Sequence, residues 1–339
     1  MPTRKSGRPA AAQLSIVVPA FNESKNLHAL HQRLCRVLDA SGTTWELIVV
    51  DDHSDDDTFE IVRELAQIDP RVRGVRLAHN FGSHTAIACG LRHAGGRSTV
   101  VMAADLQDPP ETLPELLAKW EAGAQVVWAV RAAREGERLS TLGFARLYYW
   151  MMRHVVGIRQ MPPSGADFVL LDRRVVNALR RFDESNVSIL ALITWMGYRQ
   201  AHVAYTKQPR VHGRSGWSLA SKVKLVIDSV TSFSSLPIRA MSLAGLLMAV
   251  GGFAYAAVVI VNVLTGHPVE GWSSLMVAIL VIGGTQILLM GVLGEYLWRT
   301  LDESRRRPRF LIESTAHAGL PAQSFLDNGG AMPVFLTHR

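Results

Sequence analysis

Acidic side chains follow three short apolar runs of the sequence, each close to the point where the run ends. Glu23, Asp52 and Asp105 are the acidic residues in question, one after each run. If the runs are parallel strands, their carboxyl ends meet at one edge of a sheet, which is where ligands of such sheets collect. Carboxylates gathered at that edge are suited to a divalent cation that bridges ligand phosphates.

The segment 13–205 has the pattern needed to build such a sheet. Short apolar runs predict strands at 14–18, 46–50, 72–77, 98–102 and 125–130. Helical patterns lie between them at 27–39, 59–68, 85–94 and 112–122. Repeated strand-helix-strand units imply an α/β fold, a mostly parallel sheet with helices on both faces.

Some of the acidic residues have a structural explanation. The string Asp108-Pro109-Pro110-Glu111 fits a helix start, with Asp108 as N-cap and Glu111 as its reciprocal capping partner. Asp55 and Asp57 are equally explained as caps of the helix that begins near residue 58 or as site residues. No helix start explains the acidic residues at the ends of the second and fourth strands, so those are the stronger candidates.

Two windows without charge, 240–268 and 271–294, predict helices that cross a membrane. The 24 residues 241–264 would span about 36 Å, enough for a hydrocarbon core of ~30 Å. A pair of core helices in a soluble domain is the alternative. The preceding segment, 217–238, has apolar residues at helical spacing with two lysines between them, which indicates an amphipathic helix at the membrane interface or a surface helix packed on the domain.

The basic residues that flank these windows predict their orientation. Lys222, Lys224 and Arg239 precede the first window and five arginines lie within 299–309, whereas the connection 265–271 has no Lys or Arg. The positive-inside rule therefore places both flanks in the cytoplasm. Two cysteines, too few for a disulfide framework, agree with a reducing compartment. The formal net charge of +7 does not indicate nucleic acid, because the basic residues border the membrane windows and no nucleic-acid motif is present.

Several motifs together resemble those of family 2 glycosyltransferases, and more narrowly the polyprenyl-phosphate glycosyltransferases, which include dolichyl-phosphate mannose synthases and bacterial undecaprenyl-phosphate sugar transferases. The strings that carry the resemblance are Val17-Val18-Pro19-Ala20-Phe21-Asn22-Glu23, Asp51-Asp52-His53-Ser54, Ala104-Asp105-Leu106-Gln107-Asp108-Pro109-Pro110-Glu111, Asn80-Phe81-Gly82, Gly165-Ala166-Asp167-Phe168 and Arg210-Val211-His212-Gly213-Arg214-Ser215. The resemblance extends from residue 14 to residue 299 and implies a fold of the GT-A type.

The resemblance also implies roles for individual residues. The nucleoside pocket would be lined by Pro19, Phe21, Glu23 and Asp52. Asp105, which would also contact the nucleotide and serve catalysis, would hold Mg²⁺ or Mn²⁺ on the donor diphosphate together with Gln107. Asp167 would position the acceptor or remove a proton, although pairing with an arginine is an alternative for it.

The sequence departs from the family pattern at two of these places. Many relatives have Asp-Ala-Asp-Leu-Gln, whereas this chain has Ala103 at the first acidic position. A Mg²⁺ ion held by one or two carboxylates and by substrate phosphates is still chemically reasonable. His53 replaces a glycine, and if the turn needs a positive φ, histidine is better suited to it than a β-branched residue.

Cations just before the membrane indicate where an acceptor phosphate would bind. The segment 201–227 contains five Lys and Arg residues and no acid. Arg210 and Arg214, followed by Ser215, are suited to phosphate contacts, and Arg131 and Arg134 after the fifth strand are candidates for the donor diphosphate or the lipid phosphate. General attraction to anionic headgroups is the alternative.

These observations predict an inverting glycosyltransferase that moves one sugar from a nucleotide-sugar, expected to be a UDP-sugar, to polyprenyl (undecaprenyl) phosphate. The expected site is the cytoplasmic face of a bacterial inner membrane, with both termini cytoplasmic. Alternatives are a family 2 transferase with another glycolipid or polysaccharide acceptor, and a non-catalytic membrane-tethered homologue; homo-oligomerisation is left open. The expected segments are a basic tail 1–12, a glycosyltransferase domain 13–216, the amphipathic helix 217–238, two transmembrane helices within 239–298, and a basic segment and tail 299–339.

Overall fold

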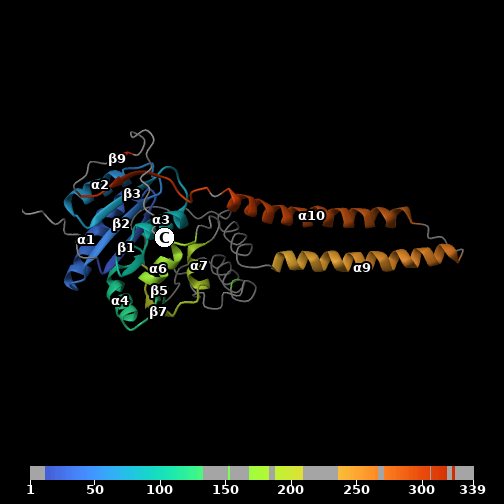
Figure 1. Ribbon diagram of the computed structural model, residues 1–339, viewed down its shortest axis with the longest axis horizontal. Helices are drawn as coiled ribbons and strands as arrows, with labels where there is room; N and C mark the ends of the chain where they lie inside the picture. The colour runs from blue at the N-terminus through green and yellow to red at the C-terminus, as the bar shows by residue number, and fades with distance from the viewer. Residues whose placement is uncertain are drawn as a thin grey trace, which may run out of the picture. The chain divides into compact units, whose positions relative to one another are not determined.

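A mixed sheet with helices on both faces carries the candidate site (Figure 1). The structure is a computed structural model that describes residues 12–132, 152, 168–182, 188–208, 236–265, 271–305, 307–318 and 323–324. The chain divides into two units. One comprises 1–149, 160–218 and 308–339, and the other comprises 150–159 and 219–307.

The described residues of the first unit form a sheet of nine strands. In sheet order these are β7 (Gln200–Tyr205), β5 (Val126–Arg131), β6 (Val169–Asp172), β4 (Ser98–Val101), β1 (Leu14–Ala20), β2 (Trp45–Asp51), β3 (Val72–Leu77), β8 (Ile312–Ala316) and β9 (Gln323–Ser324). The four neighbours β4, β1, β2 and β3 are parallel, whereas β6 and β8 pair antiparallel with their neighbours. The carboxyl ends of the four parallel strands therefore lie at one edge, as the alternating pattern predicts.

Helices cover the two faces of this sheet. They are α1 (Ser24–Ala40), α2 (Thr58–Ile68), α3 (Ser83–His93), the 3₁₀ turn η1 (Pro110–Thr112), α4 (Leu113–Glu121), α6 (Arg173–Leu179) and α7 (Ile189–Trp195). Leu14, Ile16 and Val18 of β1 are buried in one core with apolar residues of α1, α2 and α4. Val17 points to the opposite face, where Gly90 of α3 lies so close that a Cβ there would be 2.2 Å from Val17 Cγ1.

The strands and helices predicted within 14–130 are all present, with ends that differ by a few residues. The third strand has the predicted bounds, and the helix predicted at 112–122 begins as η1 and continues as α4. The α/β fold class is thus confirmed. The prediction succeeds because the central strands contain runs that are buried on both faces, such as Leu47 to Val50. The sequence of such a strand is continuously apolar.

Within 299–339, expected to be a basic segment and tail, residues Ile312–Ala316 instead form strand β8. This strand pairs antiparallel with β3, with Gly74 opposite Ala316 and Val75 opposite Thr315. The sequence IESTA is short and half polar, so it lacks the continuous apolar run that identified the central strands. It forms because β3 otherwise presents an unpaired row of backbone groups, which a further strand satisfies.

The second unit contains two long helices, α9 (Leu236–Leu264) and α10 (Trp272–Ser304), which contact each other and lie side by side in Figure 1. Ile238–Asn262 and Val281–Ser304 are long and apolar enough to cross a membrane, and neither window is buried within the protein. A core helix of a soluble protein would be mostly buried, so these exposed apolar surfaces indicate association with a membrane. The second helix continues beyond the end of the predicted window 271–294. This extension contains an ion pair between Glu295 and Arg299.

Candidate active site

The loops that follow β1, β2 and β4 meet at the carboxyl edge of the sheet, because β1 lies between the other two strands. Each loop contains one residue with left-handed backbone: Asn22, His53 and Leu106 have φ values of 57°, 61° and 60°. They are the non-glycine residues with positive φ in the described part of the chain. The turn at His53 thus has the positive φ under which histidine is better suited than a β-branched residue. Such conformations cost energy and concentrate at functional sites, so this edge is the strongest site candidate on backbone grounds.

Pro19 lies inside β1, opposite Val50 of β2. Proline normally disrupts a central strand because it has no N–H to donate. Val17 accepts from the Met102 amide on the β4 side, so alternate residues of β1 face β4, and pairing with β4 ends at Val17. The missing N–H of Pro19 is therefore directed to a point where the β4 ladder has already ended.

Two further predicted residues follow β1. Phe21 has 43% of its surface exposed at the edge of the sheet, an unusual position for a large apolar ring and one suited to packing against a flat ligand. Glu23 is the N-cap residue of α1, and its carboxylate accepts from the Asn26 side chain at 2.5 Å. Its backbone amide donates to Thr58 Oγ1 at 2.8 Å, which ties the β1 loop to the start of α2.

Asp52 is buried after β2 and organises the neighbouring loop. Its two carboxylate oxygens accept from the backbone amides of Phe81 and Gly82, each at 2.8 Å. Burial raises the pKa of Asp52, while these two amide hydrogen bonds oppose the rise. The structure thus gives Asp52 a defined role in holding the loop 80–82 at the site edge. The predicted contact of its carboxylate with base or ribose stays a prediction.

Asp105 and Gln107 lie in the loop after β4. Asp105 is nearly buried, and its Oδ1 accepts from the Gln107 amide at 3.2 Å. The side-chain nitrogen of Gln107 donates to the Gln208 carbonyl at 3.4 Å, an orientation that leaves the amide oxygen as the atom for a metal. Leu106 between them is packed into the core, which fixes the loop.

The ligand atoms around Asp105 fit a hard divalent cation only if the substrate supplies further ligands. Both candidate ligands are oxygen atoms, which Mg²⁺ and Mn²⁺ prefer. Within the described residues, no group of three or more His, Cys, Asp or Glu ligand atoms gathers around Asp105. Ala103 contributes no carboxylate, and its amide donates to Asp108 Oδ2 at 3.4 Å. Phosphate oxygens and water would have to complete the coordination shell.

Asp108 is structural, but it does not cap a helix as predicted. Its Oδ1 accepts from the Tyr205 hydroxyl at 2.6 Å, and no side chain caps η1, which begins at Pro110. Glu111, the predicted capping partner, instead forms an ion pair with Arg33 at 2.5 Å. The capping pattern was misleading because Tyr205, far away in the sequence, competes for the aspartate. Asp108 therefore joins the β4 loop to the end of β7.

Of the two explanations left open for Asp55 and Asp57, side-chain capping of α2 is not supported. Asp57 is the N-cap residue but makes no capping hydrogen bond with its side chain. Asp56 accepts instead, from the amide and the hydroxyl of Thr58 and from the Ser24 amide. Asp56 thus bridges the starts of α1 and α2, and Asp55 is exposed.

Arg131 ends β5 and lies opposite Tyr205 in the register of β5 with β7. Its side chain hydrogen-bonds the Tyr205 hydroxyl. Burial raises the pKa of Tyr205, and the neighbouring Asp108 raises it further. The phenol therefore stays protonated, and its hydroxyl donates to Asp108 of the β4 loop and accepts from Arg131 of β5. Tyr205 is a site residue that the sequence analysis missed, since a tyrosine ending a strand has no distinctive local pattern.

The remaining predicted residues, Asp167, Arg134, Arg210, Arg214 and Ser215, lie outside the described residues, as does 217–235 of the predicted amphipathic helix. Their flanks are informative. Phe168 is fully buried, with its ring edge-on to Tyr205 at 5.8 Å between centroids. The Gln208 amide donates to the Gln107 carbonyl at 3.0 Å. Arg210 is two residues further along the chain than Gln208.

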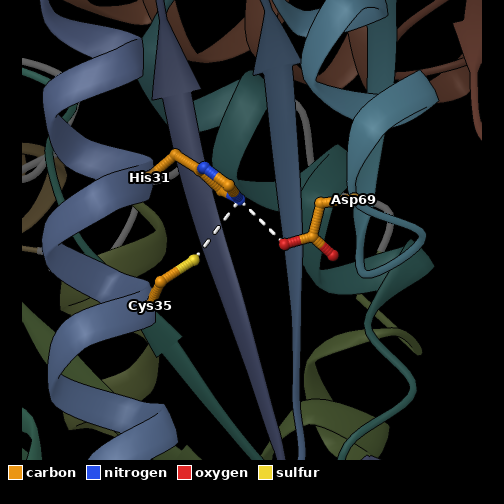
Figure 2. Close-up of side chains that lie close together, drawn as sticks. All are labelled: His31, Cys35 and Asp69. Carbon is orange, nitrogen blue, oxygen red and sulfur yellow. Dashed lines mark hydrogen bonds and ion pairs between the residues drawn. The ribbon is translucent and has the colours of Figure 1, made fainter.

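A separate cluster, His31, Cys35 and Asp69, has ligand atoms close enough for a metal ion (Figure 2). His31 Nε2 lies 2.9 Å from Asp69 Oδ2 and 3.5 Å from Cys35 Sγ. Arg71 contacts two of the same ligand atoms: its Nη2 donates to Asp69 Oδ2 at 2.8 Å and lies 3.5 Å from Cys35 Sγ. The guanidinium already supplies the positive charge, so the cluster is an ion-paired contact between α1 and the start of β3.

This contact predicts a pH-dependent stability. Burial alone would raise the pKa of Asp69, but hydrogen bonds from Arg71 and His31 outweigh burial and hold the pKa at about 2. A lowered carboxyl pKa stabilises the fold above the unfolded-state value near ~4 and loses that effect as pH falls toward 2. We expect Asp69→Asn to remove about 1–2 kcal/mol at neutral pH.

The measurement is the melting temperature of the full-length protein in detergent at pH 6 and at pH 2.5. Asp69→Asn should lower it by about 2–6 °C at pH 6, and the difference from wild type should largely vanish at pH 2.5. Asp39→Asn is the matched control, because Asp39 pairs with the same arginine but is half exposed. A difference that is the same at both pH values would contradict the assignment.

Comparison with known proteins places these features in context. The family model described as "Glycosyl transferase family 2" matches residues 15–183. An uncharacterised glycosyltransferase of Bacillus subtilis (strain 168) is 38% identical over 304 residues, covering 89% of this chain and 94% of that protein. The bactoprenol glucosyl transferase of Shigella phage SfV is 34% identical over 306 residues, covering 89% and 98%.

Among solved structures, a mannosyltransferase from Pyrobaculum calidifontis in complex with GDP-Man and Mn²⁺ is 19% identical, with a TM-score of 0.43. The match covers 86% of this chain and 88% of that one. Glucosyl-3-phosphoglycerate synthase from Mycobacterium tuberculosis is 20% identical with a TM-score of 0.49, over 65% and 78% of the two chains.

Proposed function

The chain belongs to glycosyltransferase family 2, and on this premise we propose that it transfers one sugar from a UDP-sugar to polyprenyl phosphate at the cytoplasmic face of a bacterial inner membrane. The observation that carries the proposal is similarity along almost the whole chain, apolar helices included, to proteins named bactoprenol glucosyl transferases. Such similarity extends beyond the catalytic fold to the part of the chain that would meet a lipid acceptor.

The β1, β2 and β4 loops supply the donor side of the proposed site. Phe21 offers an exposed ring for the base, and Asp105 with Gln107 offers oxygen ligands for Mg²⁺ or Mn²⁺. When bound, the cation would neutralise charge on the nucleotide diphosphate as it leaves. Asp105 is suited to hold it, because its carboxylate is nearly buried in a loop that Leu106 anchors to the core.

The acceptor side is supported by the contact between Gln107 and Gln208. This contact brings the start of the basic segment close to the β4 loop, within two residues of Arg210. Arg210, Arg214 and Ser215 would bind the lipid phosphate, and Arg131 and Arg134 would bind either phosphate group. Asp167 would position the acceptor.

The proposed reaction is a single displacement with inversion. An oxygen of the lipid phosphate attacks the anomeric carbon of the sugar, and the bond from that carbon to the nucleoside diphosphate breaks. The diphosphate leaves with the bonding electrons, and the products are polyprenyl-phosphate-linked sugar and nucleoside diphosphate. A phosphate monoester has a second pKa near ~6, so at neutral pH the nucleophile is already largely ionised and needs little base catalysis.

The pairing of β8 with β3 supports the proposed membrane topology. β8 follows α10 in the chain, yet it belongs to the same sheet as the strands that precede α9. The chain must therefore cross a membrane an even number of times between these strands. Two crossings by α9 and α10 would meet this requirement, and the basic flanks favour a cytoplasmic position for the domain.

The decisive experiment is transfer by the purified full-length protein in detergent. The protein is incubated with undecaprenyl phosphate and, in turn, UDP-glucose, UDP-galactose, UDP-N-acetylglucosamine and GDP-mannose, with Mn²⁺ or with EDTA, and the lipid product is weighed by mass spectrometry. We expect the mass of one sugar to be added from a UDP-sugar, and no product in EDTA. A polymeric product, or product from none of the donors, would contradict the proposal.

The same assay tests the acceptor site. Arg210→Ala or Arg214→Ala is expected to raise the apparent KM for undecaprenyl phosphate about 10-fold, the effect of losing a charge-assisted contact of about 1.4 kcal/mol. The KM for the donor should stay within twofold. Arg174→Ala is the control, since Arg174 is an exposed arginine on α6. If neither variant alters the KM for the lipid, the phosphate assignment of these two residues is wrong.

A further inference from the structure

Glu313 on β8 reaches the loop that follows β2, although it lies beyond both apolar helices in the chain. Its Oε2 accepts from Arg76 Nε at 2.9 Å and lies 3.4 Å from His53 Nδ1. The same Nδ1 is 3.1 Å from the Leu77 carbonyl, which can only accept, so Nδ1 carries a proton. β8 therefore contacts both His53, the left-handed residue of the β2 loop, and Arg76 of β3.

Arg76 also contacts Asp51 and Ser54, which are buried. Its Nη1 lies 3.4 Å from Asp51 Oδ2, and its Nη2 donates to the Ser54 carbonyl at 3.2 Å. Asp51 is completely buried and accepts from the Ser54 amide at 3.1 Å and from the Ser54 hydroxyl. A buried carboxylate needs both a cation and hydrogen bonds, and Arg76 supplies the cation.

Ser54 extends the network to the β1 loop. Its Oγ accepts from the Asn22 amide at 2.9 Å, and Asn22 Oδ1 accepts from the Asp55 amide at 2.9 Å. Asn22 has left-handed backbone and lies between Phe21 and Glu23. The backbones of the β1 and β2 loops are thus linked to each other, and through Arg76 to Glu313.

Arg76 is held between an inner and an outer carboxylate. Its side chain is 23% exposed, Asp51 is fully buried and Glu313 is 31% exposed. Loss of Glu313 would leave Arg76 Nε to water, and His53 Nδ1 would keep only the Leu77 carbonyl as its partner. The guanidinium would then be held only by its contacts with Asp51 and Ser54. Partly buried, multiply bonded pairs of this kind position groups more strongly than exposed pairs do.

We propose that β8 is part of the donor-binding site, with Glu313 acting as a positioning residue that fixes the β1 and β2 loops for the nucleotide. This proposal rests on the proposed function, because it assigns the nucleotide to these loops. In this arrangement, the segment that follows the membrane helices completes a site whose other parts precede them. Glu313 itself touches neither substrate in the proposed reaction.

The test compares full-length wild type, Glu313→Ala, Glu313→Gln and Glu60→Ala in detergent. Glu60→Ala is the matched control, since it removes a glutamate paired with an arginine on the neighbouring helix α2, outside the network. Titration with UDP in the presence of Mn²⁺ gives the Kd, and steady-state transfer gives kcat and KM. Glu313→Ala is expected to raise the Kd for UDP and the KM for the donor about 5–10-fold, with kcat and the KM for undecaprenyl phosphate within twofold.

The glutamine variant distinguishes a positioning role from a merely structural one. Its amide oxygen still accepts from Arg76, so Glu313→Gln should recover most of the lost affinity. Amide hydrogen exchange in the nucleotide-free proteins provides an independent reading. Glu313→Ala should speed exchange about 10-fold or more at the amides of Asn22, Ser54 and Asp55, and leave those of Phe81 and Gly82, held by Asp52, unchanged.

The two readings separate the inference from the proposed function. If UDP fails to bind wild type, the proposed donor is wrong, while the exchange pattern still tests the network. If Glu313→Ala matches Glu60→Ala in both UDP affinity and exchange at the β1 and β2 loops, the role of Glu313 is overturned. Equal speeding of exchange at Phe81 and Gly82 would also overturn it, because that pattern reports general loosening of the fold.

Discussion

Replacement of Asp105 by alanine is expected to lower turnover at least about 100-fold while leaving the fold intact. The magnitude is that of removing one preorganised group that stabilises charge in a transition state. It should be large because, in the proposed metal site, Ala103 leaves Asp105 as the carboxylate ligand, with the Gln107 oxygen as a neutral partner. The family pattern that this chain resembles has an acidic residue at the position of Ala103, so we expect the effect of losing Asp105 to be undiminished by a neighbouring acidic ligand there.

The measurement is the initial rate of sugar transfer at a series of Mn²⁺ concentrations. Asp105→Asn should be nearly as inactive as the alanine variant, since it keeps the shape and loses the charge. Asp55→Ala is the control, because Asp55 is an exposed carboxylate in the neighbouring loop. Turnover by Asp105→Ala that equals wild type at every Mn²⁺ concentration would exclude Asp105 as the metal ligand.

Arg76→Ala is expected to produce the largest loss of stability, about 3 kcal/mol, which is typical of removing one partner from a buried ion pair. The side chain is the cation for Asp51, whose carboxylate is completely buried. Without it, the negative charge of Asp51 is uncompensated apart from the hydrogen bonds of Ser54. We expect the melting temperature of the full-length protein to fall by about 6–12 °C at pH 7.5.

A double variant and the pH dependence identify the cause of that loss. Burial already raises the pKa of Asp51, and removal of Arg76 raises it further. The penalty is therefore complete above that pKa and shrinks as pH falls and the carboxyl group becomes neutral. The deficit of Arg76→Ala should be smaller at pH 5.5 than at pH 7.5, and Asp51→Asn in the Arg76→Ala background should recover part of it. A deficit that is independent of pH and unaffected by Asp51→Asn would point to lost packing instead.

Most of the fold could be predicted because its signals are local. The apolar runs that became β1, β2 and β4 are strands buried on both faces, and a few consecutive residues suffice to identify such a strand. Helix α9 could also be predicted from a local signal, because its sequence has no charge over most of its length. The carboxyl-edge position of Asp52 and Asp105 followed from the parallel order of these strands.

The parts that escaped prediction depend on partners that are distant in sequence. The sequence neighbours of Asp108 fit a helix cap, but its carboxylate instead accepts a hydrogen bond from the hydroxyl of Tyr205, 97 positions away. Glu313 is 237 positions from Arg76, and no spacing rule connects them. Asp56 rather than Asp57 caps α2 because Ser24 of the neighbouring helix also donates to it. Local patterns found acidic residues in the right loops but could not choose among them.

The position of β8 in the chain also determines when the sheet becomes complete. A ribosome delivers β1 to β7 first, then both apolar helices, and only then the residues that cover the edge of β3. During synthesis the domain therefore carries an open strand edge, which invites pairing with other chains, until the membrane segments have been made. A chain that stops before residue 312 would have every parallel strand of its sheet and still lack its last edge.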